Sequence, residues 1–395
     1  MKILITGAGG YIGKKLTYDL AKAGHTVVAL VRSTHRFNIP APIKKHIQVL
    51  EGDLLTPSSL TKIPKDIEAA YYLVHSMGHD RHNFPHLEKM CAENFIEAVK
   101  NCALKQIIYL SGLCSNSAIS LHMTSRKQVE NILKKGPFPI TVLRTSIIIG
   151  SGSASFEIIY DLVDNLPMMV APKWVKSKCQ PIAISDVLYY LTKVLSHKEC
   201  LNKTFEIGGP DVLSYKEVLL GLAAVRKLKR YILVLPLLTP HLSSLWLFLV
   251  TSTNLSIAKS LIHSLAADSV VERDTISHIL PHKCLSYIRS IEKALDPSSQ
   301  DTMPSSWKSS IVQSDLSPDL SAYIQAPVKA LTKKNIETSS LVTKEEAIKK
   351  LWSIGGENGW YHMNLAWKIR GFIDRLLGGV GLRRGRAHQI GRAHV

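Results

Sequence analysis

Two pairs of side chains within residues 120–130 (SLHMTSRKQVE) could carry acid–base or charge chemistry. His122 and Arg126 are four residues apart, as are Met123 and Lys127, so each pair would share one face of a helix. A histidine exchanges protons near neutral pH, and an arginine is a permanent cation that can bind a ribose, a phosphate or a developing oxyanion. Met123 cannot donate a proton. His122 and Arg126 are therefore the candidates for proton transfer, and a solvated helix start without a catalytic part is the alternative.

A glycine-rich turn, TGAGGYIG at residues 6–13, follows an apolar run and opens an amphipathic stretch. In that position glycines allow a tight turn, close approach of the backbone to a pyrophosphate and close packing of helix on strand. The start of the following helix offers free N–H groups and the positive end of its dipole to phosphates. This placement predicts a dinucleotide site, with a glycine turn that holds no ligand as the alternative.

The residue after the second expected strand selects between the two nicotinamide dinucleotides. Sites for NAD usually carry Asp or Glu there, and this chain has Arg32, with Lys14 and Arg36 as helpers. Arginine can bind a 2′-phosphate through charge-assisted hydrogen bonds, so the sequence favours NADP over NAD. Asp53, after the third expected strand, is predicted either to meet the adenine or to cap a helix start near Pro57.

Short β-rich apolar runs alternate with amphipathic stretches through the first 150 residues. Strands are expected at 2–6, 26–31, 46–53, 69–74, 106–112 and 140–150, and helices over about 11–23, 86–101 and 125–135. Such runs, separated by helices, indicate a parallel sheet covered on both faces. We therefore expect an α/β, doubly wound parallel Rossmann domain over residues 1–230, whose part from 151 forms a smaller substrate-side lobe.

The composition changes several times after residue 230. Residues 231–250 are long and apolar enough to be considered as a membrane span, but two prolines and a histidine interrupt them. We expect 231–295 to form an apolar helical lid or extension, with a membrane-surface patch and a true span as alternatives. Residues 296–320 are rich in Ser, Pro and Asp, as linkers are. A second domain, dense in Gly and Trp, is expected over 321–386.

The last nine residues, 387–395, have no apolar periodicity and end in IGRAHV, one possible translation of a common sequencing-library adapter. We expect this tail to be an artefact and the gene model to be truncated near Arg386. A genuine basic tail is the alternative.

Composition limits the classes of partner. Lys plus Arg exceed Asp plus Glu by 49 to 31, but no basic block with interleaved aromatic residues is present, so we expect no nucleic-acid partner. The six cysteines lie far apart without a zinc-type spacing, which predicts reduced thiols and no metal site. No signal-peptide pattern precedes the first strand. We expect a cytoplasmic protein that can contact a membrane surface peripherally, and the sequence leaves its oligomeric state open.

Several segments together resemble a bacterial family of atypical short-chain dehydrogenase/reductases, whose members are similar to NmrA-like NAD(P)-binding proteins. The most specific segments are YYLVHSMG at 71–78 and the stretch from GSGSASFE to PKWV within 150–175. Residues 354–386 resemble the opening of that family's C-terminal domain of unknown function, which is START-like and α+β in fold. Here that domain breaks off early.

The resemblance implies roles for individual residues. By this resemblance the pyrophosphate is bound by Gly7, Gly10, Tyr11, Ile12 and Gly13. Arg32 would bind the ribose phosphate, and Asp53 and Leu54 would contact the adenine. His75 and Ser76 would face the nicotinamide half, and Ser111 stands at the position of the superfamily's catalytic serine. For His75 a packed or capping histidine is the alternative. In the typical superfamily a tyrosine donates the proton and a lysine four residues later lowers its pKa. Residues 120–130 hold no tyrosine, and the family also shows His and Arg there.

Two functions follow from different classes. The first is an NADPH-dependent reductase in which His122 is the acid, aided by Arg126 and Ser111, and the substrate is an apolar, lipid-like or quinone-like molecule. The second is a non-catalytic dinucleotide-binding redox sensor or assembly factor. Fold-level analogy does not decide between them.

Overall fold

The computed structural model describes residues 1–34, 37–74, 84–113, 121–234 and 267–296, together with Leu365, Ile369 and Phe372. The chain divides into two compact units, Met1–Ser314 and Asp315–Val395. Only the three single residues, all helical and exposed, are described in the second unit. The predicted linker and C-terminal domain therefore lie almost wholly outside the described residues, and the following paragraphs concern the first unit.

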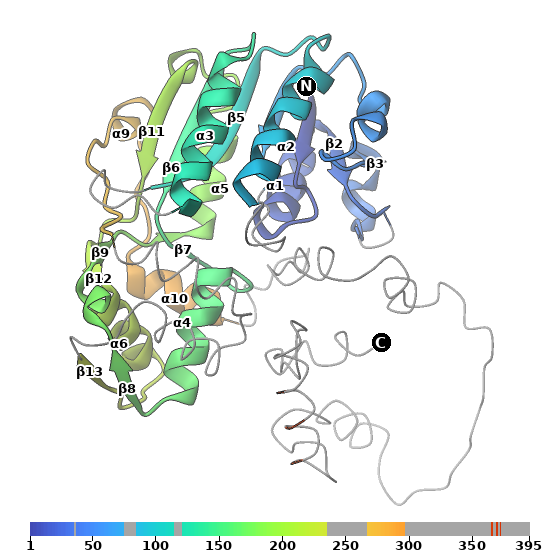
Figure 1. Cartoon of the computed structure of the whole chain (residues 1–395). Helices are drawn as coiled ribbons and strands as arrows, with labels where there is room; N and C mark the ends of the chain where they lie inside the picture. Colours follow the sequence, from blue (N-terminus) through green and yellow to red (C-terminus); the bar gives the residue numbers. More distant parts are fainter. Residues whose placement is uncertain are drawn as a thin grey trace, which may run out of the picture. The chain divides into compact units, whose positions relative to one another are not determined.

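Seven parallel strands form the central sheet (Figure 1). Their spatial order is β11 (Lys203–Ile207), β6 (Ile140–Thr145), β5 (Gln106–Gly112), β4 (Ala69–Tyr72), β1 (Lys2–Thr6), β2 (Thr26–Val31) and β3 (Ile47–Glu51). The chain runs outward from β1 to β3, then crosses back to β4 and continues the other way. The strand order thus reverses between β1 and β4, which is where Rossmann folds bind dinucleotides. The predicted doubly wound parallel sheet is confirmed.

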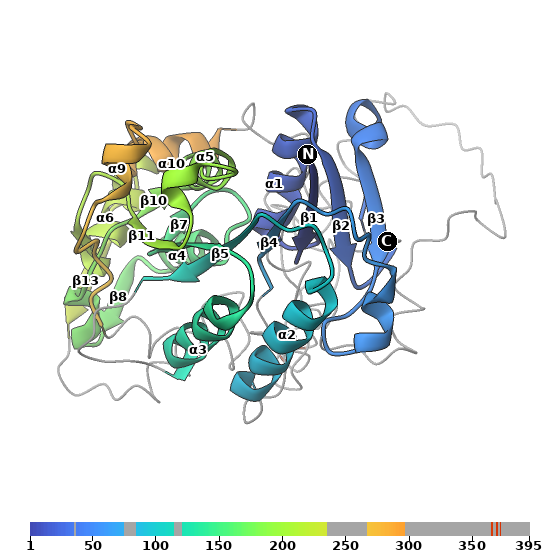
Figure 2. The ribbon, with the colours of Figure 1, turned by 90° about the horizontal axis from the view of Figure 1, so that it is seen from above.

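Helices cover both faces of this sheet (Figure 2). One face packs against α1 (Tyr11–Lys22) and α5 (Ile184–Lys193), and the other against α2 (Phe84–Val99) and α3 (Leu121–Lys135). Because side chains alternate along a strand, Tyr71 belongs to the α1/α5 face and the next residue, Tyr72, to the α2/α3 face. Burial on both faces explains why the strands are apolar throughout rather than alternating.

A smaller lobe with its own hydrophobic core follows β6. Its helices are α4 (Ala154–Asn165), α6 (Tyr215–Val225) and α10 (Tyr287–Leu295). Its short strands pair as β7 (Ile148–Ile149) with β10 (Ile182–Ala183), β9 (Lys178–Cys179) with β12 (Leu213–Ser214), and β8 (Met168–Ala171) with β13 (Tyr231–Val234). The remaining elements are α9 (Ile276–Ile279) and the 3₁₀ helices η2 (Ala41–His46), η3 (Pro57–Lys62), η4 (Lys173–Lys176) and η5 (Lys198–Cys200).

Three local expectations differ from the structure. The single strand expected over 140–150 is two strands, because β7 leaves the main sheet to pair with β10. The helix expected from about residue 125 begins at Leu121, so residues 121–130 are helical throughout. Residues 231–234, expected in a helical lid, form strand β13, and 235–266 lie outside the described residues. Among the helices that the structure describes, none is long and apolar enough to cross a bilayer.

Residues 267–296 are tied to the rest of the first unit by polar contacts. The Asp186 carboxylate, 4% exposed, accepts from the N–H of Leu285 at 2.9 Å and lies 3.1 Å from His282 Nε2. The His282 ring stacks on Tyr189, with centroids 3.9 Å apart. Tyr287 Oη donates to the carbonyl of Val218 at 2.6 Å, which anchors α10 on α6.

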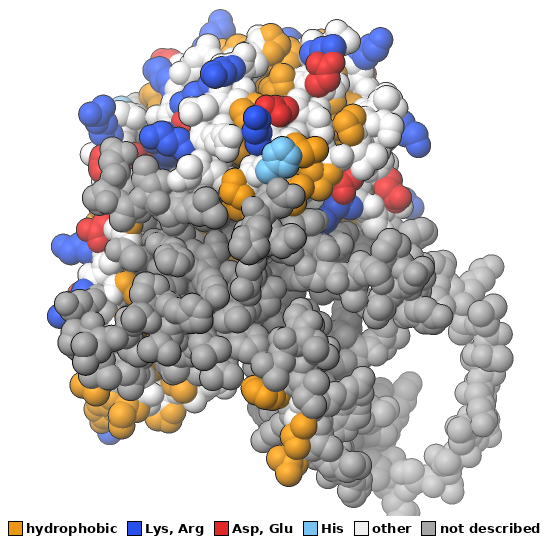
Figure 3. Space-filling model, viewed as in Figure 1, with side chains coloured by type: hydrophobic (Ala, Val, Ile, Leu, Met, Phe, Trp, Pro, Cys, Tyr) orange, Lys and Arg blue, Asp and Glu red, His pale blue; other side chains and the backbone are white. Residues whose placement is uncertain are grey.

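Three large apolar side chains remain exposed on the two-stranded pair β8 and β13. Met168 is 66% exposed, Tyr231 68% and Leu233 54%. Figure 3 shows hydrophobic side chains gathered at the lower left, over β8 and β13, whereas Lys and Arg are dispersed over the upper part of the same face. The opposite sides of these strands contribute Met169 and Ala171 to the core of the lobe.

Candidate functional site

The glycine turn between β1 and α1 has a conformation that only glycine supports at two positions. Gly7 has φ +76°, and a Cβ there would lie 2.7 Å from the carbonyl oxygen of Leu73, after β4. A Cβ on Gly13 would overlap the carbonyl oxygen of Gly7 and lie 2.8 Å from Ala8 Cα. At Gly9 a Cβ would meet only Val31 Cγ1, at 3.9 Å. Gly7 and Gly13 are thus required by the close approach of backbone segments, and Gly9 is not.

The N-terminus of α1 is open to an anion. Its N-cap is Gly10, in an extended conformation, and within the described residues no side chain caps it and no acidic residue lies in the first turn. The N–H of Gly10 donates to Gly7 at 3.0 Å, which closes the turn and leaves the first helical N–H groups directed away from the helix. Since α1 starts at the reversal point between β1 and β4, these groups fit a dinucleotide pyrophosphate.

On the adenosine side, Arg32 directly follows β2, as predicted. The register pairs the preceding Val31 with Glu51, the last residue of β3. The Glu51 carboxylate accepts from both the N–H and the Oγ1 of Thr34 at 3.0 Å. The sequence analysis missed Glu51, and its place at the end of a strand that pairs with β2 was the available signal.

Asp53 and Leu54 form a turn after β3. The Asp53 Oδ1 accepts from the N–H of Leu55 at 2.9 Å, and the Asp53 N–H donates to Ser59 Oγ at 2.9 Å. Leu54 is 4% exposed and packs in the core. Asp53 therefore fixes its own turn, and within the described residues no side chain caps the 3₁₀ helix that begins at Pro57.

The nicotinamide side is described only in part. His75 and Ser76, predicted after β4, lie outside the described residues. Ser111 lies near the carboxyl end of β5 and is 4% exposed. Because all seven strands are parallel, the ends of β1, β2, β4 and β5 meet at one edge of the sheet. The edge that carries the glycine turn therefore also carries Arg32 and Ser111.

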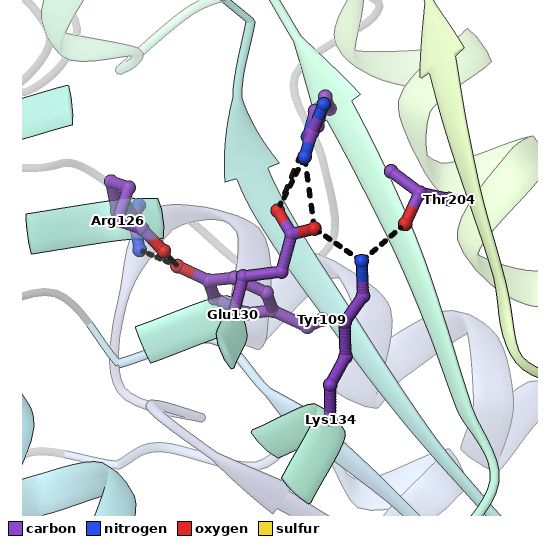
Figure 4. Close-up of polar contacts among 6 residues, drawn as sticks. Tyr109, Arg126, Glu130, Lys134 and Thr204 are labelled. Atoms are coloured by element: carbon purple, nitrogen blue, oxygen red, sulfur yellow. Dashed lines mark hydrogen bonds and ion pairs between the residues drawn. The ribbon is translucent and has the colours of Figure 1, made fainter. Parts of the chain in front are cut away.

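Tyr109 joins two of the predicted catalytic residues. Its hydroxyl donates to the Arg126 carbonyl at 3.3 Å and accepts from Arg126 Nη1 at 3.4 Å (Figure 4). Burial raises the pKa of Tyr109, although Arg126 and a hydrogen bond with the Ser111 side chain lower it. The sequence analysis missed Tyr109, which lies two residues before Ser111 and so on the same face of β5.

Arg126 is a partly buried cation whose Nε is shielded from solvent. Burial by itself would lower the pKa of Arg126, but the nearby oxygens of Tyr109 and Glu88 raise it, so the guanidinium stays charged. Its Nε has no hydrogen-bond partner among the described residues. The Glu88 carboxylate accepts from Ser125 Oγ at 2.6 Å, which fixes the neighbouring turn of α3 to α2. Arg126 therefore holds Tyr109 in place.

Met123 belongs to the second of the two pairs of residues four apart, Met123 and Lys127. Its Cε and Sδ lie 3.0 and 3.1 Å from the site of a Cβ on Gly112, so Met123 covers the end of β5 beside Ser111. Lys127, one turn later, is exposed. His122 lies in the first turn of α3, and its side chain is outside the described residues.

A buried carboxylate fixes α3 to the sheet (Figure 4). Glu130, 2% exposed, accepts from Arg144 Nε at 3.1 Å and Nη2 at 2.9 Å, and from Lys134 Nζ at 2.6 Å. Lys134 also donates to Thr204 Oγ1 on β11 at 2.9 Å. Burial would raise the pKa of Glu130, but these hydrogen bonds hold it below its ordinary value. The network sets the distance of α3 from β6 and β11, and with it the positions of Met123 and Arg126.

Comparison with known protein families supports a dinucleotide site at the edge of the sheet that carries the glycine turn. Residues 7–150 match a family model described as NAD(P)H-binding. These residues are an NAD(P)H-binding domain. Residues 333–394 match a second family, described as a protein of unknown function (DUF2867).

Relatives of the NAD(P)H-binding domain have diverse names. The chain is 22% identical over 222 residues to a chloroplastic divinyl chlorophyllide a 8-vinyl-reductase from Zea mays, which covers 53% of this chain and 55% of that protein. It is 21% identical over 224 residues to the photosystem II assembly factor Ycf39 from Synechocystis, over 55% of this chain and 66% of that protein. The chain thus spans about half to two thirds of these relatives.

A solved structure shares the fold. The NADPH-dependent quinone oxidoreductase QOR2 from Escherichia coli, complexed with NADPH, aligns with a TM-score of 0.59 at 16% identity, over 74% of this chain and all of that one. At that identity the likeness establishes the Rossmann architecture of the NAD(P)H-binding domain and leaves the activity to the chemistry of the site.

Proposed function

We propose that the protein is an NADPH-dependent reductase of an apolar, lipid-like or quinone-like substrate. The observation that carries this proposal is the uncapped glycine turn at the strand-order reversal, with Ser111 on the same edge of the sheet. The bound nicotinamide would supply the hydride. The chain's own residues would bind the dinucleotide, hold the substrate and deliver a proton.

The preference for NADPH rests on Arg32. A guanidinium after β2 can take a 2′-phosphate in charge-assisted hydrogen bonds. Two carboxylates lie at the adjoining end of β3, and both already accept hydrogen bonds: Glu51 from Thr34, and Asp53 from the Leu55 N–H. Arg32→Ala should therefore weaken NADPH binding and leave NADH binding unchanged.

Proton delivery is assigned to His122, with Ser111 as a donor to the developing oxyanion. Arg126 is a positioning residue, because it acts on Ser111 through the Tyr109 hydroxyl. Tyr109 itself is 0% exposed and does not replace the missing tyrosine. With these roles assigned to Ser111, Arg126 and Tyr109, we propose His122, at the start of α3, as the proton donor.

The apolar substrate is inferred from the small lobe. Met168, Tyr231 and Leu233 form an exposed apolar surface, and Lys227 and Lys229 beside it are exposed cations. That combination suits an anionic membrane surface. We propose that the protein works in the cytoplasm and takes its substrate from such a surface, and that residues 321–386 begin a START-like domain.

The test measures NADPH oxidation by the purified full chain with quinones of increasing alkyl length and with simple carbonyl compounds. His122→Ala should lower turnover by roughly 100-fold or more, since general acid catalysis contributes that much. The dissociation constant for NADPH should stay within about 2-fold of the parent value, because the substitution removes no expected cofactor contact.

Gln128→Ala, also on α3 but exposed, is the matched control and should retain full turnover. If His122→Ala and Gln128→Ala turn over equally well, His122 is not the acid. If no compound is reduced although NADPH binds, the reductase proposal itself is wrong.

A second function is favoured by one observation. Met123 covers the end of β5 beside Ser111, and methionine cannot donate a proton. A non-catalytic dinucleotide-binding assembly factor or redox sensor would bind NADPH tightly, turn over no substrate, and bind a partner protein with an affinity that depends on NADPH. Equal partner capture with and without NADPH would count against it.

A further inference from the structure

A histidine, a cysteine and a buried carboxylate meet where residues 267–296 pack against the start of α5. The Cys284 Sγ, a ring nitrogen of His282 and a carboxylate oxygen of Asp186 all lie within 4.8 Å of one another. Asp186 is in the first turn of α5, and His282 and Cys284 lie in the segment just before α10 (Figure 2). None of the three belongs to the glycine turn or to the residues assigned to the dinucleotide, so the cluster needs an explanation of its own.

These three side chains are ligand types that zinc takes in proteins. Zinc binds a thiolate at about 2.3 Å, an imidazole nitrogen at about 2.0–2.1 Å and a carboxylate oxygen at about 2.0–2.2 Å, in tetrahedral geometry. Magnesium and calcium prefer oxygen ligands, so the thiol of Cys284 and the imidazole of His282 disfavour them. Three protein ligands leave the fourth tetrahedral position to water.

The spacing of the three groups fits a single ion. Asp186 Oδ1 lies 3.1 Å from His282 Nε2, close to the roughly 3.4 Å that separates a nitrogen and an oxygen ligand on a tetrahedral zinc ion. A thiolate sulfur on the same ion would lie roughly 3.6 Å from each of them. Since the ligand atoms already lie within 4.8 Å of one another, the cluster would contract by roughly 1.2 Å at most.

Neighbouring groups already orient each of the three side chains. Asp186 Oδ2 accepts from a backbone N–H at 2.9 Å, which directs Oδ1 toward His282. The His282 ring stacks on Tyr189 and meets the Tyr190 ring edge-on, with centroids 3.9 and 5.7 Å apart. Tyr190 Oη lies 3.7 Å from Cys284 Sγ, so it can donate to a thiolate there. Partners of this kind fix the orientation of metal ligands and add to the affinity for the ion.

Within the described part of the chain, the charged groups that act on the Cys284 thiol are carboxylates. Burial raises the pKa of Cys284, and Asp186 and Asp274 add to the rise, whereas the hydrogen bond with Tyr190 opposes it. Lys283 lies between the two ligands in the sequence, but it is exposed, and water screens its charge. A divalent cation in the cluster would offset the carboxylates and stabilise the thiolate.

We propose that Asp186, His282 and Cys284 bind a zinc ion, with water in the fourth position, and that the ion holds residues 282–284 on α5. The Cys284 thiol releases its proton to solvent when zinc binds. This site is additional to the proposed reductase function and does not depend on it. The sequence analysis predicted no metal site because it searched for closely spaced ligands, and here the carboxylate lies 96 residues before the histidine.

Zinc titration of the full chain tests the proposal, after metal has been removed with a chelator and with the thiols kept reduced by a phosphine. Competition with a chromophoric chelator measures the affinity, and the parent should bind one zinc ion per chain. Cys284→Ser and His282→Gln should each weaken zinc binding by roughly 100-fold or more, because losing an outer partner of a metal ligand alone costs about 10- to 100-fold. With cobalt in place of zinc, the parent should show a thiolate-to-cobalt charge-transfer band, which Cys284→Ser should lose.

Cys102→Ser and His278→Gln are the matched controls. Cys102 is a free, half-buried cysteine like Cys284, His278 is an exposed histidine on α9, and neither belongs to the cluster. Both controls should bind zinc and cobalt as the parent does, and far-ultraviolet circular dichroism checks that every variant is folded. The proposal is overturned if the parent binds no zinc, or if Cys284→Ser and His282→Gln bind zinc and cobalt as the two controls do.

Discussion

Replacing Gly13 by alanine tests whether the glycine turn is built for close backbone approach. The new Cβ would overlap the Gly7 carbonyl oxygen and lie 2.8 Å from Ala8 Cα, both of them backbone atoms that cannot rotate away. Since carbon atoms pack at about 3.5–4.0 Å, the turn must shift by about 0.7 Å or more. Overpacking of this kind costs about 1–3 kcal/mol.

That cost should appear as weaker cofactor binding, lower stability or both. If the turn relaxes outward in the free protein, binding must restore the original geometry, and the dissociation constant for NADPH rises by about 5- to 150-fold. If the turn cannot relax, the free energy of unfolding falls by the same 1–3 kcal/mol. Fluorescence titration with NADPH and urea unfolding, measured on the same preparation, separate the two contributions.

Gly9→Ala is the matched control. Its Cβ would meet only Val31 Cγ1 at 3.9 Å, an ordinary contact, so both quantities should stay close to those of the parent. If Gly13→Ala matched Gly9→Ala in NADPH affinity and in stability, the argument that backbone proximity demands glycine at residue 13 would be refuted.

Three further substitutions test other parts of the structure. Arg32→Ala should raise the dissociation constant for NADPH by about 10-fold or more and leave that for NADH unchanged; equal losses would argue against a 2′-phosphate contact. Glu130→Gln should lower the free energy of unfolding by about 2 kcal/mol at pH 7, because it weakens a buried ion pair. The pKa of Glu130 is held below 4.5 in the folded state, so the loss of unfolding free energy should persist above pH 4.5 and shrink as the pH falls below it. Glu93 is exposed, so Glu93→Gln should change the free energy of unfolding little at any pH. Asp186→Ala leaves the Leu285 N–H without its acceptor and should cost about 1–3 kcal/mol in urea unfolding, and an unchanged midpoint would contradict the anchoring of residues 267–296.

Much of the sheet edge that carries the glycine turn could be predicted from the sequence, because the patterns that mark it lie within short stretches of the chain. Apolar runs of β-rich residues predicted six of the seven main strands within the first 150 residues, since burial on both faces of a parallel sheet requires them. The turn of Gly7 and Gly13 and the position of Arg32 after β2 followed from their order between strand and helix. Strand ends were less certain: residues 140–150 continue one apolar pattern although the chain leaves the sheet after Thr145.

Contacts between distant segments decided the rest. Helical periodicity placed His122 and Arg126 on one face, but it could not say that this face meets Tyr109, nor that Met123 would cover Gly112. The packing of α1 likewise depends on α5, which begins far along the chain at Ile184. Sequence patterns determine which side chains are buried, because burial depends on the period of each element. Which buried groups meet depends on how the elements pack, and in this protein that packing brings the Arg126 guanidinium to the Tyr109 hydroxyl and leaves Ser185 Oγ without a partner among the described residues.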